Sequence, residues 1–338
     1  MTDSAWRTDK ADTRFSSALQ FVLGAAWMLI AFNVSPGVAQ RFPAIYAPLV
    51  QETVILLLLL VGFGMLASRA RGATPASRTM GLVRRKTAKQ EWALGIALGW
   101  GMVVVLVLPM VLFGRLHPVF DWSPAAWNSL ILSVLVLAIS ALAEEIGFRG
   151  YPFQRLIEAI GESWATVAMA LIFGLVHLQN PHATVASTLA TVLSGILFAV
   201  AYLRTRALWL SWGLHLGWNV SMAVLFGLPV SGVTEFGSVV QTGPELPVWL
   251  TGGVYGPEGS LLASIVILIG IGVLVRTTRE YAWEYNYHPI VGAGYPMDVA
   301  PPAEHSKMEA AAAARPAPLV QILPSTPQGF TKTGDIPK

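Results

Sequence analysis

The stretch VILLLLLVGFGML (residues 54–66) decides the fold, because it is uncharged and apolar on every side of the chain. A membrane β-strand would alternate between apolar and polar residues, whereas a helix surrounded by lipid is hydrophobic all round. The whole chain is 54% hydrophobic and 12% charged, against about 25% charged residues in soluble domains. We therefore predict an all-α fold, a polytopic bundle of membrane helices.

Further apolar runs reach, or come close to, the roughly 20 residues that a helix needs to cross the hydrocarbon core. We expect about eight membrane helices, at 17–35, 46–67, 92–114, 125–146, 164–180, 183–203, 207–228 and 259–276. The first is expected to be a retained helix rather than a cleaved signal peptide, since Asp3, Asp9 and Asp12 dilute the basic residues before it.

The Lys and Arg residues are distributed unevenly among the segments between these runs. If the runs are membrane helices, 20 of the 22 Lys and Arg residues lie on one side of the membrane, the side that holds both termini. Cytoplasmic loops carry such an excess. The sequence thus predicts a multi-pass integral membrane protein with cytoplasmic termini, in the inner membrane if the protein is bacterial. The lipid bilayer, and not nucleic acid, explains the net charge of +3.

The same pattern divides the chain into five parts. They are a cytoplasmic arm (1–16), helices one to three with a basic loop (17–124), a core of helices four to seven (125–228), an outer loop with helix eight (229–276), and an Ala/Pro-rich tail (277–338). The outer loop is expected to carry a short interfacial segment. The tail has too little apolar surface to offset the entropy of ordering, so we expect a disordered cytoplasmic segment.

Three polar motifs interrupt the apolar core. They are AEEIGFRG (143–150), FGLVH (173–177) and HLGWN (215–219). In the first, Glu145 and Arg149 are four residues apart and can form an ion pair on one helix face. Glu144 then has no partner on its own helix, and the ionisable groups available to it are His177 and His215. Because ionisable residues at membrane depth are costly, they are usually functional.

Two imidazoles and one carboxylate suit zinc, and three protein ligands with an open fourth position are typical of a catalytic site. The sequence has no cysteine, so thiolate ligands and a cysteine nucleophile are excluded. The candidate metal ligands are Glu144, His177 and His215, and the reaction indicated is hydrolysis by an activated water. A second carboxylate beside such a site could act as general base.

These motifs, in this order and on the fourth, fifth and seventh predicted helices, resemble the CAAX endopeptidase and bacteriocin-processing family (CPBP, Abi) of intramembrane metalloproteases. The resemblance covers about 125–228 and includes the flanking GFRGYPFQRL and YLRTRALWLSWGLHLGWN. It implies an endopeptidase acting on a membrane-associated or membrane-delivered peptide or protein.

The resemblance also implies a role for each matching residue. Glu144 would activate water or bind the metal, and His177 and His215 would complete the site. Glu145 would be the electrostatic partner of Arg149. Asn219 would orient His215 or hydrogen-bond the developing oxyanion, with Phe173 packed beneath His177.

Several alternatives stay open at this stage. The enzyme could use a divalent metal, which we favour, or a carboxylate-activated water without metal. A proton-coupled transporter and an inactive family member acting as a membrane scaffold are the rival functions. The substrate, including whether it is prenylated, cannot be read from these residues.

One geometric condition must also be met. Glu144 lies ~28 Å along helix four, near its cytoplasmic end, whereas His177 lies ~20 Å along helix five. Straight helices with these bounds would keep the two residues apart. We therefore expect YPFQRLIEAIGESW (151–164) to form a separate amphipathic segment, re-entrant or interfacial.

Overall fold

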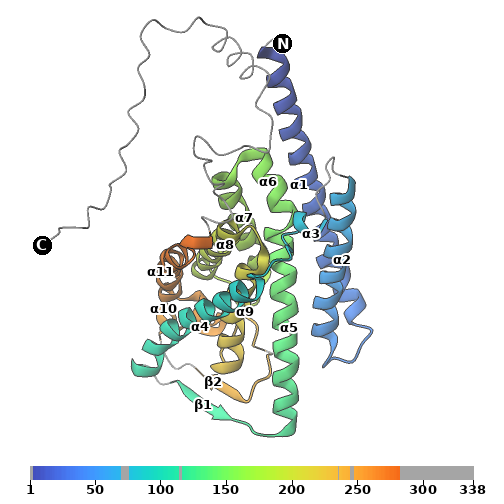
Figure 1. Cartoon of the computed structure of the whole chain (residues 1–338). Helices are drawn as coiled ribbons and strands as arrows, with labels where there is room; N and C mark the ends of the chain where they lie inside the picture. Colours follow the sequence, from blue (N-terminus) through green and yellow to red (C-terminus); the bar gives the residue numbers. More distant parts are fainter. Residues whose placement is uncertain (1–2, 70–75, 114–115, 235, 244–246, 282–338) are drawn as a thin grey trace, which may run out of the picture. The chain divides into compact units, whose positions relative to one another are not determined.

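The computed structural model describes residues 3–69, 76–113, 116–234, 236–243 and 247–281. The long helices are α1 (Asp3–Ala39), α2 (Ala47–Arg69), α4 (Ala88–Phe113), α5 (Pro124–Arg149) and α8 (Val185–Thr205). Shorter apolar helices are α7 (Glu162–Val176), α9 (Leu208–Val220) and α11 (Leu261–Thr277). The remaining helices are α3 (Ala76–Thr79), α6 (Tyr151–Ile160) and α10 (Val248–Thr251), and the strands are β1 (His117–Phe120) and β2 (Val240–Gly243) (Figure 1).

The predicted helical class is confirmed in the described residues. Each of the eight predicted apolar runs coincides with one helix, and five helical segments are long and apolar enough to cross a membrane. Helices α7, α9 and α11, with 15, 13 and 17 residues, are shorter than that. The number of spans and the cytoplasmic location of the termini therefore stay predictions.

Some details differ from the sequence-based expectations. Helix α1 already begins at Asp3, so most of the expected N-terminal arm is helical. The outer loop contains β2, which pairs antiparallel with β1, and the short helix α10. The predicted tail lies outside the described residues from 282 onward. The strand pair was not foreseen, because residues 117–120 pair with residues far away in the sequence.

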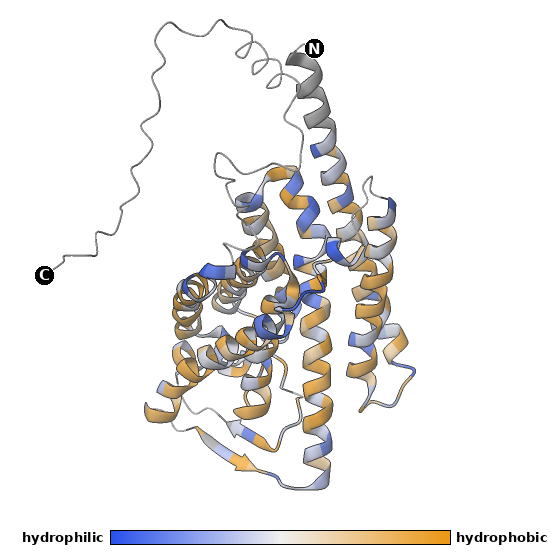
Figure 2. Cartoon of the chain, in the orientation of Figure 1, coloured by the Kyte–Doolittle hydropathy of each residue, from blue (hydrophilic) through white to orange (hydrophobic). Residues whose placement is uncertain are grey.

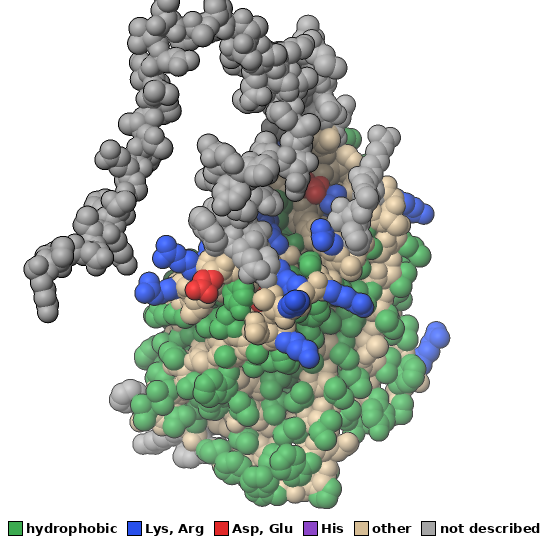
Figure 3. All heavy atoms as spheres, viewed as in Figure 1, with side chains coloured by type: hydrophobic (Ala, Val, Ile, Leu, Met, Phe, Trp, Pro, Cys, Tyr) green, Lys and Arg blue, Asp and Glu red, His purple; other side chains and the backbone are tan. Residues whose placement is uncertain are grey.

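Large apolar side chains cover much of the helix surfaces. Exposed examples are Phe15 on α1, Leu57 on α2, Ile131 on α5 and Leu175 on α7, which are between 55% and 75% exposed. Figures 2 and 3 show the apolar residues as a broad zone along these helices, with Lys and Arg gathered toward one end. A soluble monomer rarely exposes such continuous apolar surface, whereas a membrane protein turns it toward lipid.

Helices α4 and α9 pack closely against each other, and this contact fixes the helix that carries HLGWN. A Cβ atom added at Gly217, between His215 and Asn219, would lie 2.5 Å from the backbone oxygen of Ile96 on α4. Gly95, Gly99 and Gly213 are equally crowded by the backbone of the facing helix. The backbones can approach this closely because the residues between them have no side chains.

We expect Gly217→Ala to separate α4 from α9 and to lower the free energy of unfolding by about 1–3 kcal/mol, the usual cost of overpacking. Gly101→Ala is the matched control, because nothing lies within 4 Å of a Cβ added at Gly101 of α4. Thermal unfolding of both variants in the same detergent measures the difference. Equal melting temperatures for the two variants would contradict this account of the α4–α9 contact.

The expected amphipathic segment is present as α6. Its face with Tyr151, Pro152, Phe153 and Leu156 is buried, and it packs against α1. Helix α6 continues past the end of α5, and α7 then returns beside α8 (Figure 1). From Glu144 to the end of α6 the chain rises ~24 Å, and α7 descends about the same distance to His177. This turn satisfies the geometric condition that straight helices could not meet.

Candidate active site

Glu145 lies in a fully buried ion pair, as the spacing of AEEIGFRG predicts. Its Oε1 atom lies 3.2 Å from Nη1 of Arg149, and the side chains are 0% and 2% exposed. Both residues are on the last turns of α5. A buried carboxylate needs such a partner, because an isolated charge in a low-dielectric interior is very costly.

The guanidinium of Arg149 has further partners that hold its orientation. Nη2 donates to the carbonyl oxygen of Gly195 on α8 at 3.2 Å. The guanidinium carbon lies 4.4 Å from the ring centre of Phe173 and 5.1 Å from that of Phe198. Arg149 therefore connects α5, α7 and α8 through one buried cation, using both its hydrogen-bond donors and its attraction to aromatic faces.

His215 of α9 is oriented by Glu145. The Nδ1 atom of His215 lies 3.0 Å from Oε1 of Glu145, and its ring stacks on Phe198 with 4.5 Å between ring centres. Because a carboxylate accepts, Nδ1 carries the hydrogen, and in a neutral imidazole the lone pair is then on Nε2. A carboxylate in this position behind a histidine is typical of metal and catalytic sites. Both roles expected for Asn219, orientation of His215 and a hydrogen bond to the oxyanion, stay predictions.

His177 is oriented by the backbone of its own helix. The residue follows α7 as the first residue of the 3₁₀ turn η1 (His177–Gln179), and its Nδ1 donates to the carbonyl oxygen of Phe173 at 2.7 Å. The rings of His177 and Phe173 are 4.4 Å apart, so the predicted packing of Phe173 beneath this histidine is confirmed. As in His215, Nε2 keeps its lone pair.

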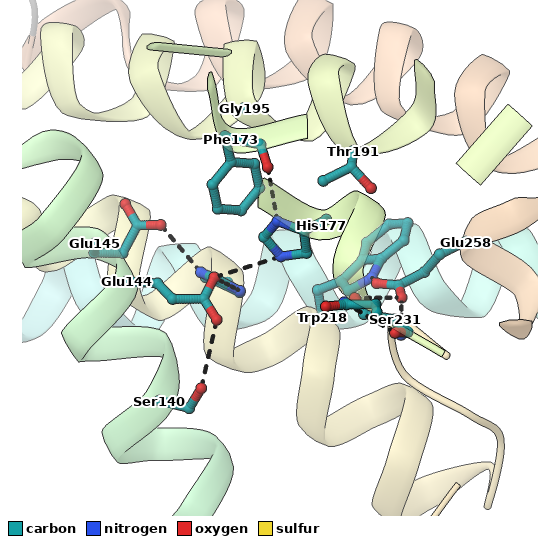
Figure 4. Close-up of polar contacts among 12 residues, drawn as sticks. Ser140, Glu144, Glu145, Phe173, His177, Thr191, Gly195, Trp218, Ser231 and Glu258 are labelled. Carbon is teal, nitrogen blue, oxygen red and sulfur yellow. Dashed lines mark hydrogen bonds and ion pairs between the residues drawn. The ribbon is translucent and has the colours of Figure 1, made fainter. Parts of the chain in front are cut away.

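Both histidines approach Glu144, and Figure 4 shows the contact of His177 with this carboxylate. The Nε2 atoms of His177 and His215 each lie 3.9 Å from Oε2 of Glu144. That oxygen is buried and has no hydrogen-bond partner among the residues that the structure describes. The other oxygen, Oε1, accepts a long hydrogen bond of 3.5 Å from Ser140. Both Nε2 atoms thus approach the same carboxylate oxygen, at distances that leave space for a bridging atom.

The donor set fits a divalent metal in its chemistry, while the distances are slightly long. Two neutral imidazole nitrogens and a carboxylate are common zinc ligands, and two ligands on one tetrahedral zinc lie roughly 3.4 Å apart. The separations of 3.9 Å would have to close by about half an ångström. In the part of the chain that the structure describes, no three metal-binding side chains meet the spacing of a metal cluster as they stand.

Glu52 is a further carboxylate near the site, and the sequence analysis did not single it out. It lies on α2, where its side chain interacts with Ser140 and is close enough to Glu144 for their charges to interact. A signal existed, because Glu52 is an ionisable residue within the predicted helix 46–67. Ser140 lies between the two carboxylates in this chain of contacts.

Comparison with known families agrees with the geometry. Residues 125–221 match the family model described as type II CAAX prenyl endopeptidase Rce1-like. No curated protein and no solved structure matches the chain. The matched segment contains the three polar motifs and indicates a protease of the intramembrane class, with a peptide or protein substrate at the membrane. Residues 125–221 thus match the Rce1-like CAAX endopeptidase domain of the CPBP family.

Proposed function

We propose that this chain is an intramembrane endopeptidase. Its active site, formed by Glu144, His177 and His215, would hydrolyse a peptide bond of the substrate. The observation that carries the proposal is the convergence of both Nε2 atoms on the unpartnered Oε2 of Glu144, at 3.9 Å each. Hydrogen bonds at both Nδ1 atoms fix the tautomers that make this convergence useful. If Glu144 served only to stabilise the fold, we would expect a hydrogen-bond donor in direct contact with its Oε2 atom.

A water molecule between these groups would be activated by Glu144. The carboxylate takes a proton from the water as the oxygen bonds to the carbonyl carbon, and then gives that proton to the amine nitrogen as the C–N bond breaks. Without a metal, one histidine Nε2 atom holds the water in place by accepting its other hydrogen. With a metal, both Nε2 atoms would be ligands instead. Asn219, one turn beyond His215, is the proposed donor to the oxyanion, because such donors stabilise developing charge.

We propose further that Glu144, His177 and His215 hold a divalent ion, with zinc the best match to the donor set. The ion would supply Lewis acidity to the reacting water and carbonyl. Glu145 would act through His215, by holding this histidine in the ligating tautomer.

Metal analysis of the purified chain tests this assignment. We expect about one divalent ion per chain in wild-type protein purified without chelators. The double variant His177→Ala/His215→Ala should lose it, since two of the three ligands are gone. His182→Ala is the control, because this histidine lies in the turn after α7 and outside the convergence. Wild-type protein purified without bound metal would overturn the metal assignment. The mechanism in which Glu144 activates water without a metal would then be retained.

The family match suggests a substrate at the membrane. We propose a membrane-associated or membrane-delivered peptide or protein, and nothing in these side chains requires a prenyl group. Proteomic comparison of membranes containing wild-type protein or Glu144→Gln should identify it. Peptides with new termini should appear in the wild-type membranes alone. Identical terminal peptides in both membranes would contradict a proteolytic function.

A further inference from the structure

The carboxylate of Glu258 contacts both Trp218 and Ser231, which lie far from it in the sequence. It lies in the 3₁₀ turn η4 (Pro257–Gly259) of the outer loop. Its Oε1 accepts from Nε1 of Trp218 on α9 at 2.7 Å. Its Oε2 accepts from the hydroxyl of Ser231 at 2.9 Å and also from the backbone N–H of Ser231. Figure 4 shows these contacts beside the histidine site. Hydrogen bonds to a charged acceptor are the strong ones.

Both ends of this network lead to a candidate catalytic histidine. Trp218 is three residues after His215 and lies on the same helix. Ser231 accepts, at its carbonyl oxygen, a 3.0 Å hydrogen bond from Nδ2 of Asn180. Asn180 follows η1, and its backbone N–H donates to the carbonyl oxygen of His177 at 3.1 Å. Glu258 therefore connects the segment of His215 to the segment of His177.

Each histidine segment borders an irregular stretch of helix. His177 lies where α7 ends and a 3₁₀ turn begins, and such turns have poorer hydrogen-bond geometry. Helix α9 has 13 residues and continues into a π-helical stretch, Ser221–Leu225. The distances of 3.9 Å from both histidines to Glu144 depend on where these segments lie. A connection from outside these helices, between the His177 segment and the His215 segment, would help to fix both distances.

The loop that carries Glu258 is itself well defined. Ser231 adopts a left-handed backbone conformation with φ of 50°, and Gly232 donates from its N–H to the carbonyl oxygen of Tyr255 at 2.9 Å. Burial raises the pKa of Tyr255 to about 12. The Tyr255 side chain also interacts with Ser231 and Asn180. The network thus has two connections to the residues after His177.

We propose that Glu258 is a positioning residue, which sets the separation of the His177 and His215 segments and thereby the geometry around Glu144. This inference rests on the proposed function for the role of the histidines. It assigns no contact between Glu258 and substrate. A carboxylate in the outer loop would thus control the alignment of a site formed by membrane helices.

Kinetics with Glu258→Gln test the effect on the reaction. The amide oxygen of this variant can still accept from Trp218, but its NH₂ group cannot accept from Ser231, so one of the two connections is lost. We expect kcat to fall about tenfold to a hundredfold with little change in KM, because small misplacements of catalytic groups slow the chemical step. Thr242→Val is the matched control, since it removes one outer-loop hydrogen bond, to the carbonyl oxygen of Phe226 at 2.6 Å, without touching the network.

Spin-label distances test the positioning itself and do not depend on activity. The chain has no cysteine, so Leu178→Cys after His177 and Leu225→Cys after α9 would carry the only labels. Both positions are about half exposed, 50% and 51%. We expect Glu258→Gln to shift or broaden the distance distribution and Thr242→Val to leave it unchanged.

The two measurements separate the possible failures. An unchanged distribution in Glu258→Gln overturns the positioning role, whatever happens to kcat, and an equal loss of kcat in both variants does so as well. If wild-type protein cleaves nothing while Glu258→Gln shifts the distribution, the connection stands and the proposed function fails.

Discussion

Glu144→Gln protein should cleave its substrate about a thousandfold more slowly than wild type, the effect expected when a general base is removed. The change keeps the shape of the side chain and removes the proton acceptor at Oε2. The protein should stay folded, because Oε2 of Glu144 has no partner to lose and the contact of Oε1 with Ser140 is long, at 3.5 Å. Loss of kcat at an unchanged melting temperature is therefore the expected result.

Glu162→Gln provides the control for this experiment. Glu162 is a half-exposed carboxylate paired with Arg206 at the start of α7, and exposed pairs contribute only about 0–1 kcal/mol. Its removal should leave both activity and melting temperature close to wild type. Cleavage by Glu144→Gln at the wild-type rate would rule out Glu144 as the base. An equal loss of activity in Glu162→Gln would show that removing any carboxylate charge slows the reaction.

Local patterns predicted much of this fold and site. The eight apolar runs match eight helices, because a helix in lipid must be apolar along its whole length and this is visible in one sequence. The Glu145–Arg149 pair was predictable because residues four apart share a helix face. The approach of His177 and His215 to Glu144 was predictable by elimination, since a lone carboxylate at membrane depth needs a partner.

Contacts between distant segments were not predictable in this way. The sequence assigned Glu145 to Arg149 alone, whereas in the structure the same Oε1 atom also contacts His215. That contact depends on the packing of α5 against α9, which periodicity does not reveal. The pairing of β1 with β2 and the link from Glu258 to Trp218 likewise join residues with no sequence signal for each other.

Helix ends were predicted less well than helix centres. The predicted helix 164–180 includes His177, but α7 ends at Val176 and His177 begins a 3₁₀ turn. Hydrophobicity does not mark this change at Val176, because the apolar Leu178 follows and the turn residues Asn180 and Pro181 come only later. The difference has a consequence for function, because a histidine at a helix end depends on the loop beyond it for its position.

Arg149→Met should be the most destabilising single change in the site. It leaves Glu145, which is 0% exposed, without the guanidinium that balances its charge. It also removes the donor to Gly195 and the cation between Phe173 and Phe198. Breaking a buried ion pair from one side costs about 3–5 kcal/mol. We expect a large fall in melting temperature, measured by thermal unfolding in detergent, together with loss of activity.

The double variant Arg149→Met/Glu145→Gln separates stability from catalysis. Removing both charges leaves no unpaired ion, and apolar or neutral replacements of buried pairs are often tolerated. Most of the lost stability should return, so the coupling between the two substitutions in a double-mutant cycle should be large and favourable.

Activity of the double variant should recover only in part, to about tenfold to a hundredfold below wild type. The amide introduced by Glu145→Gln can still accept a hydrogen bond from Nδ1 of His215, but it no longer carries a negative charge behind this histidine. Full recovery of kcat would show that Glu145 serves only as the counter-ion of Arg149. A double variant as unstable as Arg149→Met would show instead that the guanidinium stabilises the fold through Gly195 and the aromatic rings.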